Sequence, residues 1–166
     1  MREEIDQLLK NLKLHRMRAV MPRELQRAAE QASPPDELLL RLLREQWAHA
    51  QERSAHNRLA AARLGETFEL ATFPWRSQPA VNQSQIEHLS HLEFIREGSN
   101  VVFIGEPGVG KTGLATGLLL KALQAGYAGR FIKAQDLFEQ MYASLADRTT
   151  PAYLRQLERL PVMVID

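Results

Sequence analysis

Hydrophobic and polar residues alternate along the first third of the chain with the spacing of amphipathic helices. The first stripe predicts a helix over residues 3–21, with apolar side chains at i, i+3, i+4 and i+7: Ile5, Leu8, Leu9 and Leu12. Pro22 is expected to break this helix, because proline has no backbone N–H to donate. A second, shorter helix with the same spacing is then predicted over 25–32.

A long third helix is predicted over about 34–64. Ser33 can cap its first turn, Pro34 suits the first helical position, and Gly65 is expected to end it. The early apolar face of this helix consists of Leu39, Leu42, Leu43 and Trp47.

The helical spacing stops after this third helix. Gly, Pro, Ser, Thr and Asn are frequent over 65–84, which predicts a mostly irregular connector between two domains. Its aromatic residues Phe68, Phe73 and Trp75 are expected to pack onto the second domain, and contact with an adenine base is the alternative. A helix is predicted to follow over 84–97.

Beyond the connector, short apolar runs alternate with helical spacing. Strands are predicted over 100–104, 130–134 and 161–165, and helices over 111–125, 136–145 and 150–160. Such alternation predicts an α/β fold with a parallel sheet and right-handed crossovers. The expected architecture is an N-terminal helical domain followed by a partial parallel sheet with flanking helices.

A glycine-rich segment lies between the first predicted strand and its helix. Its eight residues match the pattern G-x-x-x-x-G-K-[ST] in full: Gly105, Glu106, Pro107, Gly108, Val109, Gly110, Lys111 and Thr112. Gly113 follows directly after the pattern. Glycines let backbone N–H groups approach an anion, and the positive end of the following helix strengthens that field. We therefore predict a phosphate-binding loop for ATP, in which Lys111 reaches the outer phosphates as a catalytic residue and Thr112 binds Mg²⁺.

The last predicted strand ends in an acid, Asp166. Ligands of such sheets bind at the carboxyl ends of the strands, and an acid in this position helps to hold Mg²⁺ in nucleotide-binding proteins. Asp166 is therefore predicted as a catalytic residue and, with Thr112, as a Mg²⁺ ligand. A strand that ends at the last residue of the chain favours a fragment of a longer protein.

Composition excludes several classes of protein. The 166 residues are 45% hydrophobic and 25% charged, which indicates a folded core. The chain has no cysteine, which excludes a disulfide framework and cysteine-bound zinc and fits a cytoplasmic location. No apolar run approaches the roughly 20 residues that span a bilayer, so no membrane contact is expected. Without a G-x-S-x-G segment, hydrolase chemistry through a serine nucleophile has no support.

Positive charge is concentrated in the first part of the chain. Residues 1–64 carry 12 Lys and Arg against 9 Asp and Glu, a balance of +3, whereas the whole chain has a net charge of +1. Four basic side chains of the third helix fall within about 80° of one another at 100° per residue: His49, Arg53, His56 and Arg63. A solvated helix face is the favoured interpretation of this stripe, and contact with DNA phosphates is the alternative that makes these four residues candidates for DNA binding.

Together these features resemble the N-terminal portion of IstB-like transposition helper ATPases, which are related to the DnaC helicase loaders of the AAA+ superfamily. The phosphate loop is shared by many ATPases, whereas its combination with a helical N-terminal domain and an aromatic connector is more specific. Five further stretches carry the resemblance: the basic segment 58–64, the connector 67–75, the helix 86–95, the start of a helix at 134–137 and the strand 162–166.

The resemblance implies that residues 1–64 form a helical domain for DNA and transposase and that 65–84 connect it to a partial AAA+ ATP-binding domain over 85–166, truncated after the Walker B strand. It also implies a homo-oligomer in the full-length form. The family pattern continues with a water-activating glutamate, a sensor residue and a trans-acting arginine, so the ATPase activity of this chain is left open. Gly113 and Glu106 replace a histidine and a proline that are common in the family, and neither change removes a phosphate ligand.

Three other interpretations stay open. A DnaC-like helicase loader in DNA replication would share the chemistry and differ in its partner. A truncated, non-catalytic remnant would act as an interaction module through residues 1–64. A small P-loop kinase usually carries its loop near the start of the chain, so a loop that begins at Gly105 argues against that class.

Overall fold

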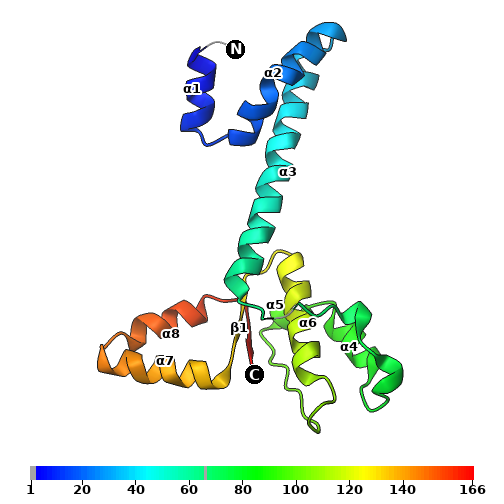
Figure 1. Cartoon of the computed structure of the whole chain (residues 1–166), viewed down its shortest axis with the longest axis vertical. Coiled ribbons are helices and arrows are strands. Elements are labelled where there is room, and N and C mark those ends of the chain that lie inside the picture. The colour runs from blue at the N-terminus through cyan, green and yellow to red at the C-terminus, as the bar shows by residue number, and fades with distance from the viewer. Residues whose placement is uncertain (1–2, 66) are drawn as a thin grey trace. The chain divides into compact units, whose positions relative to one another are not determined.

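The computed structural model describes residues 3–65 and 67–166, and the chain divides into two compact units, Met1–Ser54 and Ala55–Asp166. The division falls within helix α3 (Pro35–Ala62), the long helix in Figure 1. The first unit is helical throughout its described residues, apart from short turns, and the second combines helices with a small parallel sheet. The expected division into 1–64, 65–84 and 85–166 remains a prediction.

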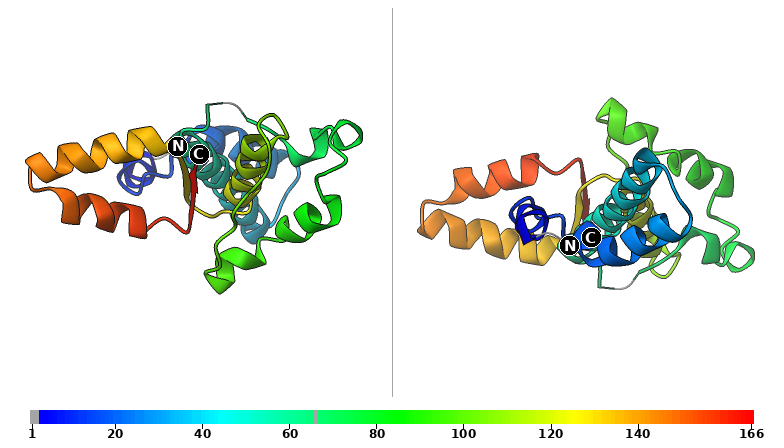
Figure 2. Two further views of the ribbon diagram at one scale, coloured as in Figure 1. Left: turned by 90° about the horizontal axis from the view of Figure 1, so that it is seen from below. Right: turned by 90° about the horizontal axis from the view of Figure 1, so that it is seen from above.

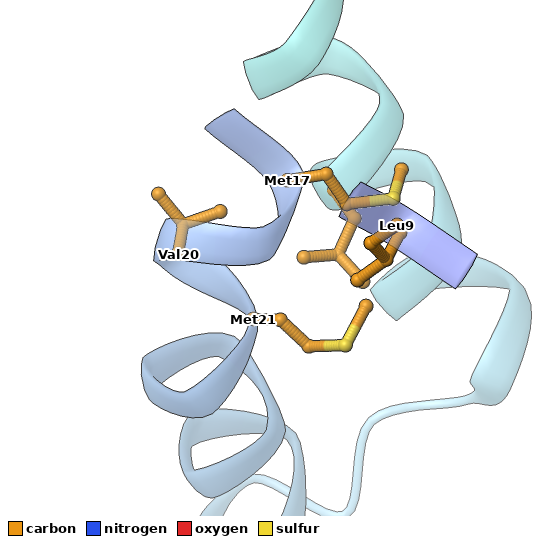
Figure 3. Close-up of a cluster of buried hydrophobic side chains, with 5 residues drawn as sticks. Leu9, Met17, Val20 and Met21 are labelled. Carbon is orange, nitrogen blue, oxygen red and sulfur yellow. The ribbon is translucent and has the colours of Figure 1, made fainter. Parts of the chain in front are cut away.

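The first unit packs helix α1 (Glu3–Asn11), helix α2 (His15–Glu30) and the beginning of α3 around one apolar cluster. Its buried side chains come from all three helices: Leu9, Met17, Val20, Met21 and Leu42. Figure 3 labels the members from α1 and α2, which are Leu9, Met17, Val20 and Met21. The stripe predicted on α1 therefore contributes Leu9 to the core, while Leu8 and Leu12 remain exposed.

The predicted helix break at Pro22 is wrong. Pro22 lies inside α2, and the chain turns instead between α1 and α2, where Lys13 adopts a φ of 57°. A proline inside a helix costs about 3 kcal/mol. The burial of Met17, Val20 and Met21 on this helix contributes about 1.5 to 3 kcal/mol for each side chain. Continuous packing of one helix face therefore outweighs the missing hydrogen bond.

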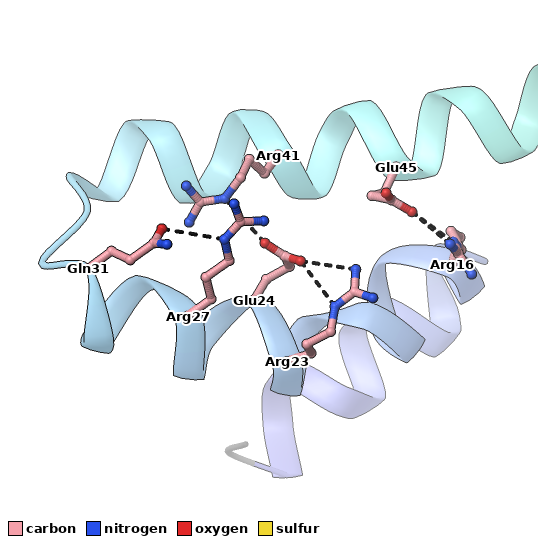
Figure 4. Close-up of polar contacts among 7 residues, drawn as sticks. All are labelled: Arg16, Arg23, Glu24, Arg27, Gln31, Arg41 and Glu45. Carbon is pink, nitrogen blue, oxygen red and sulfur yellow. Dashed lines mark hydrogen bonds and ion pairs between the residues drawn. The ribbon is translucent and has the colours of Figure 1, made fainter.

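A buried acid joins α2 to α3. Glu24 is only 3% exposed, and its carboxylate accepts hydrogen bonds from Arg23 on the same helix and from Arg41 on α3, as Figure 4 shows. Arg16 and Glu45 form a second link between the two helices, at 2.8 Å. Because a buried carboxylate without a partner is costly, these arginines let Glu24 occupy the interface.

A third ion pair connects α1 to α2. The guanidinium of Arg18 donates to both carboxylate oxygens of Asp6, at 2.7 and 2.9 Å. These hydrogen bonds lower the pKa of Asp6 below its usual 3.8. A depressed pKa means that this pair stabilises the fold above the ordinary pKa of the carboxyl and is lost as the pH falls below that range.

The predicted apolar face of α3 is only partly correct. Leu42 is buried and Leu38 packs against the same cluster, whereas Leu39, Leu43 and Trp47 are 54, 48 and 65% exposed. Helix α3 also ends at Ala62 and not at Gly65. The left-handed residue that terminates it is Arg63, with a φ of 54°.

The second unit is built on a two-stranded parallel sheet of β1 (Gly129–Ile132) and β2 (Val162–Ile165), in the register Gly129 to Val162. Helix α6 (Lys111–Gln124) packs on both strands, and its buried Leu119 and Leu123 meet Ala62 at the end of α3. Helices α7 (Ala134–Ala146) and α8 (Thr150–Glu158) form the crossover between the strands and lie side by side in Figures 1 and 2.

The connector and the helix after it are more broken than predicted. The connector contains two short 3₁₀ helices, η1 (Leu70–Thr72) and η2 (Trp75–Ser77). The single helix predicted over 84–97 is instead two helices, α4 (Gln83–Leu89) and α5 (Glu93–Glu97). Leu92 separates them, because its φ of 62° cannot continue a right-handed helix and its side chain is buried in this conformation.

The strand predicted over 100–104 is absent from the described residues. A strand exists only where its backbone pairs with a neighbour, and within the described residues β1 pairs with β2 alone. The run keeps the alternation of a strand, since Val101 and Phe103 are partly buried while Val102 and Ile104 are 76 and 92% exposed. The predicted strand is therefore wrong for the described residues, because the pairing that a strand needs is not formed.

Candidate phosphate-binding site

The glycine-rich loop lies at the start of helix α6, in the exposed position that a phosphate site requires. Gly108 and Gly110 have φ angles of 83° and 93°, which a side chain would make unfavourable. Gly110 is the residue directly before the helix, and its carbonyl accepts the first helical hydrogen bond from Leu114. Among the described residues, the backbone N–H groups of 105–112, which Pro107 lacks, donate to no backbone carbonyl outside the helix, so they remain available to an anion.

The ammonium group of Lys111 lies across the loop. Its Nζ donates to the carbonyl oxygens of Gly105 and Glu106, at 2.8 and 2.9 Å. Lys111 is partly exposed, and Gly105 and Glu106 are exposed. The positive charge is therefore already held next to the loop, at a point where a phosphate oxygen could replace the two carbonyls.

Thr112 and Asp166 meet although 54 residues separate them in the sequence. The Thr112 hydroxyl lies 3.0 and 3.1 Å from the two carboxylate oxygens of Asp166. The backbone of Asp166 extends the sheet, because its N–H donates to Ile132 and its carbonyl accepts from Ala134 at the start of α7. The parallel register of β1 and β2 thus places the acid at the head of α6.

The Thr112 and Asp166 side chains fit a Mg²⁺ ion by their chemistry. Both offer hard oxygen atoms, both are exposed, and Asp166 lines the same groove as Lys111. Mg²⁺ is bound by one or two protein oxygens together with phosphates and water in sites of this kind. Within the described residues no group of three or more His, Asp or Glu side chains could hold a metal ion by itself.

An aromatic cluster lies beneath the loop. Phe73 is 4% exposed and forms a core with Ile86 of α4 and Leu114 of α6, and Phe68 and Trp75 pack against it. The rings of Phe68 and Phe73 meet edge to face with centroids 6.0 Å apart. The prediction that the connector aromatics pack onto the second part of the chain is therefore confirmed, and an adenine contact is not needed to explain their burial.

A groove of about 460 Å³ runs beside the site, between residues 98–103 and β2. Lys111 and Asp166 line one end of it, and apolar side chains such as Phe103, Leu118 and Val164 line the rest. Residues on both sides of the groove belong to the run before the loop and to β2, two segments that do not pair as strands.

The basic residues predicted to contact DNA do not all share one helical face. His49 and Arg53 lie in the first unit and His56 in the second, and all three are exposed on α3. Arg63 is also exposed, but it follows the end of α3 with a left-handed backbone, so the 100° spacing does not extend to it. None of the helices in the described residues is long and apolar enough to cross a membrane.

Sequence reasoning did not find two contacts, one with the loop and one with the helix that follows it. Gln78 donates from its side-chain amide to the carbonyl of Gly108, at 3.3 Å, and Leu70 packs over Gly117 on α6. The recurrence of glycine at 110, 113 and 117 was the available signal, since such spacing leaves one face of a helix without side chains.

Comparison with known proteins identifies the family. The family model described as IstB-like ATP binding protein matches residues 7–166, nearly the whole chain. A Pseudomonas aeruginosa protein named as an ATP-binding protein of insertion sequence IS21 is 29% identical over 163 residues, which are 98% of this chain and 62% of that protein.

Two further relatives belong to the same group. A Geobacillus stearothermophilus protein named for ATP binding in insertion sequence IS5376 is 33% identical over 78% of this chain and 52% of its own length. An IS21-like relative from Bacteroides fragilis is 26% identical over 99% of this chain and 83% of its own. The chain thus spans 62 and 52% of the first two relatives, and 83% of the third.

Proposed function

This chain belongs to the IstB-like ATP-binding protein family, and on that premise we propose that it binds ATP with Mg²⁺ and serves as a helper protein in the transposition of an insertion sequence. The observation that carries this proposal is the convergence of Lys111, Thr112 and Asp166 at one glycine loop, with Thr112 and Asp166 only 3.0 Å apart. These are the side chains that phosphate and Mg²⁺ require.

The roles of the side chains follow from their positions. The N–H groups around Gly108 and Gly110 bind the β-phosphate, and Lys111 exchanges its two carbonyl acceptors for oxygens of the β- and γ-phosphates. Thr112 and Asp166 hold Mg²⁺, directly or through water. The bound ion neutralises phosphate charge. The remaining loop residues, Gly105, Glu106, Pro107 and Val109, shape the turn, and Gly113 follows them in the first turn of α6.

The Mg²⁺ part of the proposal predicts a selective loss in an Asp166→Asn variant. This change keeps the shape of the side chain and removes its charge, so the affinity for ATP in excess Mg²⁺ should fall by on the order of tenfold. Affinity measured in EDTA should not fall, because the carboxylate then repels the nucleotide. Isothermal titration with and without Mg²⁺ measures both, and Asp147→Asn, an exposed acid after α7, is the matched control. Equal losses in both buffers would contradict a metal role.

DNA contact is the second part of the proposal, and the exposed basic residues support it. Four basic residues are exposed: His49, Arg53, His56 and Arg63. They lie within residues 1–64, where Lys and Arg outnumber Asp and Glu. Contacts of this type read phosphates and not bases, so the binding should depend little on sequence.

The DNA proposal predicts a steep dependence on salt. Each lost phosphate contact should reduce the slope of log affinity against log salt by about 0.9. We expect Arg53→Ala and Arg63→Ala each to remove about one phosphate contact, and the double variant about two, with the matching reduction of the slope. Fluorescence anisotropy with a labelled duplex at several salt concentrations measures this. Arg155→Ala, an exposed arginine of α8, should leave the slope unchanged. Wild-type slopes in the double variant would exclude these arginines.

We further propose, from the family, that the partners are a transposase and other copies of the same protein, and that it acts in the cytoplasm. The insertion-sequence names of the relatives favour transposition over the helicase-loader alternative. Copurification of the chain with the transposase from the same insertion sequence, in the presence and absence of ATP, tests the partner. Binding to a replicative helicase in its place would favour the alternative.

A further inference from the structure

The connector lies directly on helix α6, where glycines leave room for it. Gly113 and Gly117 share one face of the helix because they are four residues apart, and Gly110 directly precedes the first residue of α6. Phe73 covers Gly110, Phe68 covers Gly113 and Leu70 covers Gly117. The connector therefore packs against about two turns of this segment.

The fit is close at both ends of this segment. A Cβ atom on Gly110 would lie 2.7 Å from a ring carbon of Phe73, and one on Gly117 would lie 2.7 Å from a methyl carbon of Leu70 and 3.3 Å from the carbonyl oxygen of Phe68. A Cβ atom on Gly113 would be in ordinary contact with the Phe68 ring, at 3.5 Å. The connector thus occupies the volume that side chains at 110 and 117 would need.

Two of these contacts reach the phosphate loop itself. Phe73 packs on Gly110, and the Gln78 side chain donates to the carbonyl of Gly108 at 3.3 Å. Gly108 and Gly110 are the two loop residues with positive φ, so their conformation decides where the neighbouring N–H groups point. The buried side chain of Phe73 is fixed in turn by Ile86 and Leu114.

We propose that the connector holds the phosphate loop in its anion-binding shape, with Phe73 and Gln78 as positioning residues for ATP. This inference rests on the proposed function, because it concerns the affinity of the same loop for ATP. The shape of the loop then depends on the connector as well as on the loop's own residues.

The sharpest test uses a residue that cannot touch the nucleotide. Gly117 lies about 9 Å along the helix from Lys111, at 1.5 Å per residue. Alanine favours helices more than glycine does, so Gly117→Ala would be harmless to an isolated α6. Because its new methyl group displaces Leu70 and the connector, we expect the affinity for a fluorescent ATP analogue to fall about tenfold, as small displacements of positioning groups do.

A compensating change separates positioning from general damage. Leu70→Ala in the Gly117→Ala background makes room for the methyl group, and the double variant should regain most of the lost affinity. Gly65→Ala is the matched control, since nothing lies within 4 Å of its Cβ position. Thermal unfolding without nucleotide is recorded for every variant. A purely structural role would lower the melting temperature and leave the affinity of the folded protein unchanged, which would overturn the proposal.

Gln78→Ala provides a second, milder variant that keeps the aromatic core intact. It removes only the hydrogen bond to Gly108 and should weaken ATP binding about threefold, whereas Gln83→Ala on the exposed side of α4 should have no effect. Wild-type affinity in both Gly117→Ala and Gln78→Ala, with binding lost in Lys111→Ala, would overturn the positioning role and leave ATP binding intact. Wild-type affinity in Lys111→Ala would overturn the proposed function and this inference with it.

Discussion

Replacement of Lys111 by alanine is expected to reduce the affinity for ATP by about 10 to 100-fold. A hydrogen bond to a charged group contributes about 1.5 to 3 kcal/mol, and each 1.4 kcal/mol corresponds to about a factor of ten in affinity. The ammonium group of Lys111 is the positive side chain closest to the loop, held by the carbonyls of Gly105 and Glu106. Its loss removes the charge that faces the phosphates and leaves the helix intact, since alanine is the best helix former.

Lys121→Ala is the matched control for this experiment. Lys121 lies on the same helix α6, and its Nζ lies 3.2 Å from the hydroxyl of Ser90, away from the loop. Titration of a fluorescent ATP analogue should therefore give wild-type affinity for Lys121→Ala and a large loss for Lys111→Ala. Equal affinities for the two variants would show that the nucleotide does not bind at this loop. A loss in both would indicate a general effect of net charge.

The phosphate loop could be predicted from sequence because its chemistry is local. Eight consecutive residues, Gly105–Thr112, carry the backbone conformation and the charge, and the start of α6 at Lys111 follows from the same segment. Asp166 could be predicted because an apolar strand leads to it, although Met163 and Ile165 of that strand are exposed, and parallel pairing sets the place of the acid at the carboxyl end of the strand. The meeting of Thr112 with Asp166 agrees with that argument.

Features that depend on packing could not be predicted in the same way. Pro22 is a strong local signal for a break, yet Met17 and Met21 are buried on one continuous helix. Leu92 gives no local signal for a left-handed residue, and it splits the predicted helix 84–97 because its side chain packs inward. In both places tertiary burial outweighs intrinsic preference, which is weak for a single residue.

The pattern around residue 100 shows a different limit. The continuous apolar run from Val101 to Ile104 is typical of a strand, but hydrogen bonds to a neighbouring strand are what make one, and the run does not say which segment pairs. The contacts between the connector and α6 were equally hidden, because Gly117 and Leu70 lie 47 residues apart. A glycine stripe indicates close approach without naming the approaching segment.

Replacement of Leu119 by alanine is expected to cost about 2 to 5 kcal/mol of the free energy of unfolding, the range for a buried leucine that leaves a cavity. Leu119 is fully buried on α6, between Ala62 at the end of α3 and the apolar residues of both strands: Phe131, Val162 and Val164. A Cβ atom on Gly129 would lie 2.5 Å from one of its methyl carbons, so the strand backbone also packs closely on this side chain.

The loss should be near the upper end of that range because the neighbours of Leu119 cannot collapse into the space. Phe131, Val162 and Val164 are held by the sheet, and Leu123 is fixed by the same helix. Since small domains are stable by about 5 to 15 kcal/mol, the variant would be close to unfolding at 37 °C. Urea titration in a Trp47→Phe background, where Trp75 is the only tryptophan and reports on the second unit, measures the change. Leu145→Ala, 62% exposed on α7, is the control, and a midpoint for Leu119→Ala equal to that control would mean that α6 is not the central packing element of this unit.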